Sequence, residues 1–135
     1  MLTIQQYFGK PHSAEQEGAA DDLLVRVNEL LAEAQAEGSY DGWLDPDTDT
    51  QISGAKGSDG DGGFRTPSSR TGVPSSSHRQ AKAVDVYDPH EILEDWITDA
   101  ILEKYELYRE APEATPGWVH LTTRAPASGH RTFIP

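Results

Sequence analysis

Two histidines and one aspartate of this chain are of the residue types that bind metal ions. His78 is followed seven residues later by Asp85, and His120 lies two residues after a tryptophan in a largely apolar stretch. Because the chain has no cysteine, any zinc site must be built from imidazole nitrogens and carboxylate oxygens. His78, Asp85 and His120 are the candidates for such a site, in which three protein ligands leave a coordination position open for water or substrate.

Asp85 lies where a carboxylate would need such a partner. Residues 82–87 fit a short strand in which Ala83, Asp85 and Tyr87 share one face and two valines share the other. Burying a bare charge costs heavily, so a carboxylate on a buried strand requires a cation or strong hydrogen bonds. The simpler alternatives are a chance spacing of His78 and Asp85 and an ordinary strand histidine at position 120, and the spacing alone leaves these open.

Helical spacing of apolar residues predicts two main helices that flank this strand. The first helix spans about residues 20–37, where leucines form one buried stripe behind an acidic first turn. The second spans residues 88–104, with Asp88 as its N-cap and Glu91 completing a capping box. Trp96 falls on the buried side of this helix and is expected to fill the core.

Short apolar runs predict a small sheet. Strands are expected at residues 82–87, 106–110 and 118–123, with a turn containing proline and glycine at 111–117 that joins the last two as a hairpin. Residues 38–77 are rich in Gly, Ser and Asp and are expected to form a long loop, with short strands near residues 50–53 and Phe64. The sequence thus predicts a single α+β domain over residues 1–135, with two main helices and a small sheet.

Charge limits the partners of this chain. It has 135 residues, with 23 Asp and Glu against 11 Lys and Arg, for a net charge of -12. Such a field disfavours nucleic acid and anionic membranes as partners. The opening residues lack the basic-then-apolar pattern of a secretion signal, and no apolar run reaches the ~20 residues of a membrane span. We expect a protein made in the cytoplasm without a signal peptide.

Three elements of the chain resemble, in matching order, motifs of the zinc D-alanyl-D-alanine metallopeptidases. Residues 76–85, from Ser76 to Asp85, resemble their motif Ser-x-His-x-x-Gly-x-Ala-x-Asp. Trp118-Val119-His120 resembles their second motif, in which a tryptophan shortly precedes the last ligand. Gly63-Phe64-Arg65 resembles their glycine–aromatic–arginine element upstream of the first histidine.

The resemblance is wider still to small peptidase-like proteins encoded by bacteriophages. These share Tyr87-Asp88-Pro89 after the ligand aspartate, a C-terminal pattern like residues 128–135 and an opening like residues 2–8, so the resemblance covers nearly the whole chain. Relatives outside phages include the lysostaphin-like and hedgehog-like zinc folds. Those are α+β folds built on a small antiparallel sheet, so the resemblance implies such a sheet here, with His78, Asp85 and His120 as its zinc ligands.

This resemblance implies a zinc-dependent peptidase that acts on the peptide stems of bacterial peptidoglycan during phage entry or host lysis. Arg65 would bind a carboxylate of the substrate, a task that suits the guanidinium fork, and Lys56 or Arg79 is the reserve choice. Ser76 and Trp118 would also contact the substrate. The protein would be made in the host cytoplasm, and its other partners would be proteins of the phage virion.

Two positions depart from the family pattern. Ala81 stands where the first motif has glycine, and Gly117 stands where the family has its catalytic carboxylate, three residues before the last ligand. A zinc hydrolase needs a general base to accept the proton of the attacking water. Glu110, at the end of a predicted strand, is the first candidate, and Glu113 is the second. If neither serves, the chain is a catalytically silent phage structural protein that keeps the fold and the metal.

Other polar groups are expected to be ordinary surface features. Residues 45–49 begin like a calcium loop but lack its later glycine and glutamate, so we expect an acidic surface turn. His12 and His130 are expected to be exposed in loops, and His90 to lie in the first turn of the second helix.

Overall fold

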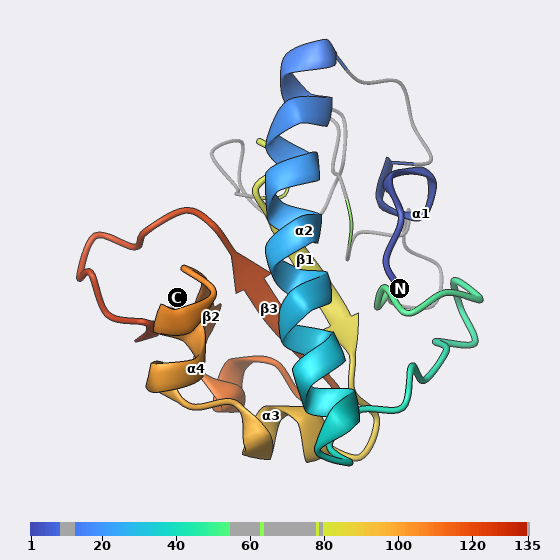
Figure 1. The fold of residues 1–135 in the computed structure, drawn as a ribbon, viewed down its shortest axis with the longest axis vertical. Coiled ribbons are helices and arrows are strands. Elements are labelled where there is room, and N and C mark those ends of the chain that lie inside the picture. The colour runs from blue at the N-terminus through green and yellow to red at the C-terminus, as the bar shows by residue number, and fades with distance from the viewer. Residues whose placement is uncertain (9–12, 55–62, 64–77, 79, 135) are drawn as a thin grey trace.

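A computed structural model describes the whole chain except residues 9–12, 55–62, 64–77, 79 and 135 (Figure 1). Within the described residues the chain is α+β, as predicted, with helices set against a four-stranded mixed sheet. In chain order the elements are α1 Ile4–Phe8, α2 Ala14–Ala36, β1 Ala83–Tyr87, α3 Ile92–Trp96, α4 Asp99–Lys104, β2 Tyr108–Glu110, the 3-10 helix η1 Pro112–Ala114, β3 Trp118–Thr122 and β4 Thr132–Phe133.

The sheet has the strand order β1-β3-β2-β4. Strands β1 and β2 both pair antiparallel with β3, so the predicted hairpin between β2 and β3 is present. Strand β4 instead pairs parallel with β2, so the prediction of a purely antiparallel sheet is wrong at this edge. The reason is that β3 ends beside the start of β2, and the loop 123–131 brings the chain into β4 from that same end.

Helix α2 packs across one face of the sheet and supplies much of the core (Figure 1). It begins at Ala14 rather than near residue 20, because Ser13 is the N-cap and forms a capping box with Gln16. Along each strand, the side chains that face α2 alternate with those on the far face. The core between helix and sheet consists of Leu23, Leu24, Val27, Leu30, Leu31 and Ala34 of α2, with Val84, Val86, Val119 and Leu121 of the sheet.

The second predicted helix is divided in two, so the prediction of one helix over residues 88–104 is wrong. Ile97 is extended, with φ -70° and ψ 127°, and ends α3. Thr98 then begins α4 as its N-cap, and its Oγ1 accepts a hydrogen bond from the backbone N–H of Ile101 at 3.3 Å. A strong capping residue inside an apolar pattern of helical period therefore starts a new helix. Trp96, at the end of α3, is partly buried against the core.

Asp88 does cap this region, but not in the way the sequence suggests. Its carboxylate accepts the backbone N–H groups of Leu93 at 3.1 Å and Glu94 at 2.9 Å, so it holds the start of α3 from outside the helix. Glu91 is in the left-handed region with φ 58° and makes no side-chain cap, so the predicted capping box is absent. His90 lies in the turn before α3 rather than in its first turn, and it is exposed.

The outer edge of β1 is covered by the segment that follows α2. Ile52 forms an isolated bridge with Val86, which confirms short extended structure near residues 50–53, while Phe64 lies outside the described residues. The backbone N–H of Ser53 donates to the carbonyl of Asp85 at 2.8 Å. The neighbouring Asp45 is buried, and its carboxylate accepts the backbone N–H groups of residues 47 and 54. This carboxylate therefore organises a turn.

None of the described helices has both the length and the apolar character that crossing a membrane requires.

Candidate metal centre

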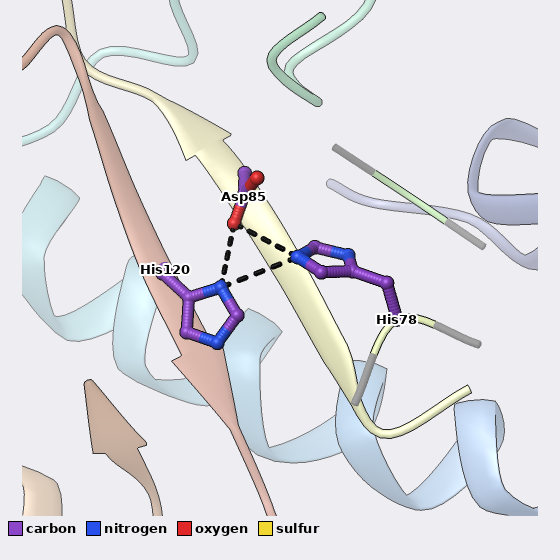
Figure 2. Close-up of side chains that lie close together, drawn as sticks. All are labelled: His78, Asp85 and His120. Atoms are coloured by element: carbon purple, nitrogen blue, oxygen red, sulfur yellow. Dashed lines mark hydrogen bonds and ion pairs between the residues drawn. The ribbon is translucent and has the colours of Figure 1, made fainter. Parts of the chain in front are cut away.

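The side chains of His78, Asp85 and His120 meet on the sheet face opposite α2 (Figure 2). His120 Nδ1 lies 2.8 Å from Asp85 Oδ1 and 3.2 Å from His78 Nε2. His78 Nε2 lies 3.3 Å from Asp85 Oδ1. The three side chains that the sequence predicted as ligands therefore converge on one point and can hold a metal ion.

The sheet brings two of these side chains together. Asp85 and His120 are direct partners in the antiparallel register of β1 and β3. Directly opposed residues project from the same face with Cβ atoms ~4.5–5.5 Å apart. His78 comes from the turn before β1, where Ala81 donates its backbone N–H to the His78 carbonyl at 3.3 Å. Ala81 has φ 58°, a conformation that favours glycine, which stands at this position in the family motif.

The cluster is deeply buried. Exposed fractions are 2% for His78, 8% for Asp85 and 7% for His120. Burial acts to raise the pKa of the Asp85 carboxyl, but the charge of His78 and the hydrogen bonds from His120 and His78 outweigh burial and hold this pKa below its usual range. The environment thus favours a carboxylate anion beside two imidazoles. A buried anion of this kind calls for a positive partner.

The spacing of the donor atoms suits zinc with a small outward adjustment. Tetrahedral zinc with bonds of ~2.0–2.2 Å separates its ligand atoms by about 3.4 Å. The three separations here are 2.8, 3.2 and 3.3 Å. Two imidazoles with one carboxylate also form a donor set that catalytic zinc sites use. The residues present therefore fit a zinc ion.

His78 is held in the tautomer that a metal ligand needs. Its Nδ1 lies 2.9 Å from the carbonyl oxygen of Gly63. Because a carbonyl only accepts hydrogen bonds, Nδ1 carries a proton, so Nε2, which faces Asp85 and His120, is the nitrogen available as a metal ligand. Metal-binding histidines commonly donate their second ring N–H to a backbone carbonyl in this way.

Glu110 lies on the same face of the sheet as the cluster. In the pairing of β2 with β3, Tyr108 faces Thr122 and Arg109 faces Leu121. Side chains alternate along a strand, so Glu110 shares a face with Tyr108, and His120 shares that face with Thr122. Glu110 is also the partner of Phe133 in β4. It is half-buried.

The other candidate base is placed differently. Glu113 lies in η1 and is exposed. Its charge acts on Arg109, whose Nη1 donates to the backbone carbonyl of Glu94 in α3 at 3.1 Å. The side chain of Arg109 is on the face of β2 opposite Tyr108, so the one interaction found for Glu113 is with a group away from the cluster.

Gly117, at the position of the family carboxylate, has a conformation suited to glycine. Its φ is 88°, and its carbonyl accepts the backbone N–H of Asp88 at 2.9 Å. A Cβ added there would meet nothing within 4 Å, so the strain of the backbone rather than a steric clash disfavours a larger residue. The backbone geometry before β3 therefore suits glycine at this position.

Aromatic rings border the cluster. Trp118 is the register partner of Tyr87, and both are half-exposed two register pairs along from Asp85 and His120. This placement beside the cluster suits the substrate contact predicted for Trp118. The ring of Phe133 contacts that of His120 edge to face, with centroids 6.2 Å apart and planes at 88°. Nothing in the sequence identified Phe133, because β4 is only two residues long.

The residues predicted to bind substrate on the upstream side cannot be placed. Arg65, Ser76 and the reserve cations Lys56 and Arg79 all lie outside the described residues, as does His12. A described cation does lie on the metal-bearing face. The guanidinium carbon of Arg131 lies 4.4 Å from the ring centroid of Tyr108, and its Nη1 donates to the carbonyl of Leu107 at 3.1 Å. His130, beside it, is exposed as predicted.

Comparison with known proteins adds no relative. No protein-family model, no curated protein and no solved structure matched this chain. The metal centre therefore rests on the geometry described above, and the family resemblance rests on the sequence motifs.

Proposed function

We propose that this chain is a zinc-dependent peptidase of the D-alanyl-D-alanine metallopeptidase type, with a hedgehog-like fold, that cleaves the peptide stems of bacterial peptidoglycan. The observation that carries the proposal is the convergence of His78, Asp85 and His120, whose ligand atoms all lie within 4.8 Å of one another. The order of the sequence motifs supports the assignment to this family. The resemblance of residues 2–8 and 128–135 to phage proteins supports a role in phage entry or host lysis.

The residues at and around the cluster would have separate roles in catalysis. His78 Nε2, Asp85 Oδ1 and His120 Nδ1 would hold the ion, and the carboxylate would offset part of its charge. Zinc bound there supplies a Lewis acid for the scissile carbonyl and lowers the pKa of water toward ~7. Trp118 and Tyr87 would bound the substrate on one side of the cluster.

A peptidase also needs a group that accepts a proton from water, and Glu110 is the best-placed candidate. It follows Tyr108 by two positions in β2 and therefore projects from the face that carries His120. Its side chain is half-buried and therefore partly open to solvent. A carboxylate within hydrogen-bond reach of a water, directly or through a second water, meets the geometric requirement for a general base.

Metal analysis followed by an activity assay tests the proposal. The purified protein should contain close to one zinc per chain, and His120→Ala should lose it. Zinc-loaded protein should release smaller products from peptidoglycan stem peptides, as measured by chromatography with mass spectrometry, and His120→Ala should release none. Absence of zinc from protein refolded in its presence would refute the proposal.

The second candidate is a catalytically silent phage structural protein that keeps the zinc site. Two observations favour it: the glycine conformation at Gly117 and the burial of all three ligands. On this reading zinc stabilises the fold, and the protein binds other virion proteins. Zinc-loaded wild type that is stabilised by the metal and cleaves no stem peptide would establish this alternative.

A further inference from the structure

We propose that Gly63 and helix α1 position His78, so that the N-terminal segment is a working part of the metal centre. The inference deepens the proposed function and rests on its zinc-binding part. Three contacts connect these elements to the ligand, and each has a separate physical consequence.

The first contact fixes the imidazole of His78. Its Nδ1 donates to the Gly63 carbonyl at 2.9 Å, and both residues are buried. Loss of this acceptor would leave a buried N–H unsatisfied, at a cost of about 1–3 kcal/mol. The ring would then rotate or shift its proton to Nε2, the atom that faces Asp85. Either change removes the lone pair from the metal position.

The second contact fixes Gly63 itself. A Cβ at this position would lie 2.5 Å from the backbone oxygen of Tyr7 and 3.3 Å from its carbonyl carbon. These are main-chain atoms of α1, so they cannot swing away as the end of a flexible side chain would. Only glycine can occupy this position unless α1 or the Gly63 carbonyl moves. The glycine is therefore required by close approach of two backbones.

The third contact ties α1 to the strand that carries Asp85. Tyr7 is 1% exposed, and its hydroxyl donates to the carbonyl of Ala83 in β1 at 2.7 Å. At the start of the chain, the backbone of Leu2 makes two hydrogen bonds with the side chain of Asn28 in α2, each 2.9 Å long. Helix α1 is thus anchored at both ends.

Together these contacts form a closed series that includes two of the three ligands. The series runs from Asp85 along β1 to Ala83 and through Tyr7 to Gly63. It then returns from Gly63 through His78 to Asp85. A shift of α1 would therefore change the position of His78 relative to Asp85. Groups that orient a ligand in this way commonly contribute 10–100-fold to metal affinity.

The test compares Gly63→Ala with Gly18→Ala. Gly18 is an exposed residue of α2 with nothing within 4 Å of an added Cβ, so its substitution should be harmless. Zinc affinity, measured by competition with a chromophoric chelator, should fall about 10–100-fold in Gly63→Ala and stay unchanged in Gly18→Ala. Equal affinity of Gly63→Ala and wild type would overturn the inference.

A second readout does not depend on zinc. Nitrogen-15 NMR of the metal-free wild type should show His78 protonated at Nδ1, and Gly63→Ala should lose this preference. If Gly63→Ala does not fold, Tyr7→Phe takes its place, because it removes the bond to Ala83 and keeps the ring. Its affinity should fall less than tenfold but measurably, and no change would count against the role of α1. A wild type that binds no zinc defeats the proposed function, while the NMR result still decides the positioning of His78.

Discussion

Asp85 and His120 lie opposite each other in the register of β1 and β3, and their Oδ1 and Nδ1 atoms are 2.8 Å apart. This pairing places an anion and an imidazole side by side in a nearly closed environment, with exposed fractions of 8% and 7%. Two such groups are costly to bury unless a cation or a proton balances them. The stability of the fold should therefore depend on what occupies the space between them.

Zinc should stabilise the wild type, and Asp85→Asn should abolish this effect. A ligand that binds only the folded state stabilises it by about 2.7 kcal/mol at a free concentration of 100 times its Kd. The melting temperature should accordingly rise with zinc and fall with chelator in wild type, as measured by scanning calorimetry. Asp21→Asn, an exposed residue of α2, is the matched control and should respond as wild type does. A full zinc response in Asp85→Asn would exclude this carboxylate as a ligand.

Glu94 in α3 should make stability depend on pH. Burial raises its pKa from 4.5 to about 7, although a hydrogen bond from Thr115 acts to lower it. The folded state therefore binds a proton more tightly than the unfolded state does. The resulting stabilisation is fully present below pH 4.5 and is lost as pH rises through about 7.

Substitution isolates this effect. Glu94→Gln keeps the shape without the charge, so its free energy of unfolding should fall less between pH 5 and 8 than that of wild type, as measured with urea. Glu103→Gln, an exposed residue of α4, should leave the wild-type slope intact. Identical slopes for wild type and Glu94→Gln would show that Glu94 is ionised across this range.

The ligands could be predicted from sequence because their arrangement depends on local rules. Alternation along a strand separates Asp85 from the valines on either side, and the same rule assigns His120 to one face of β3. His78 followed from its spacing and from the family motif. For Asp85 and His120, a side-chain type and a place on a strand were sufficient.

Other features depend on information that the sequence expresses weakly. The contact of Gly63 with His78 uses a backbone carbonyl, which every residue has, so no residue type in the sequence predicts this contact. The break at Thr98 arose where a capping residue interrupts an apolar pattern that would suit a single helix. The start of α2 was misplaced because the acidic pair near residue 21 resembled a first turn, although Ser13 and Gln16 already formed a capping box.

Arg131 should contribute to recognition of an anionic peptide. Its guanidinium is held over the ring of Tyr108, on the face that carries the metal cluster, and the chain is otherwise strongly acidic. A hydrogen bond to a charged group contributes about 1.5–3 kcal/mol, so Arg131→Gln should weaken binding of a stem peptide with free carboxylates by about 10–100-fold. Calorimetric titration measures this, and a peptide with amidated carboxylates should bind both proteins equally.

The matched control is Arg26→Gln. Arg26 is paired with Asp22 on α2, on the other side of the sheet, and its loss should leave peptide affinity unchanged. Zinc affinity should be unaffected in both variants. If Arg131→Gln binds the free peptide as well as wild type does, the guanidinium only fastens the C-terminal segment to β2 through Tyr108 and Leu107.

Glu110 should act as the general base if the protein is a peptidase. Its position in β2 places it on the face of His120, whereas the backbone at Gly117 does not favour a carboxylate. Glu110→Gln preserves size and removes basicity, so kcat should fall about 10²–10⁴-fold, the usual contribution of a general base. Zinc content should stay at the wild-type level, since Glu110 is not among the three ligands. Steady-state hydrolysis of a stem peptide measures the rate, and metal analysis measures the zinc.

Glu113→Gln is the matched control for this prediction. Glu113 follows Glu110 by three positions, is exposed in η1, and acts electrostatically on Arg109, whose side chain lies on the opposite face of β2 from Tyr108. Its substitution should therefore leave kcat close to that of wild type. A loss in Glu113→Gln with full activity in Glu110→Gln would reverse the assignment. Full activity in both variants would place the base outside this hairpin.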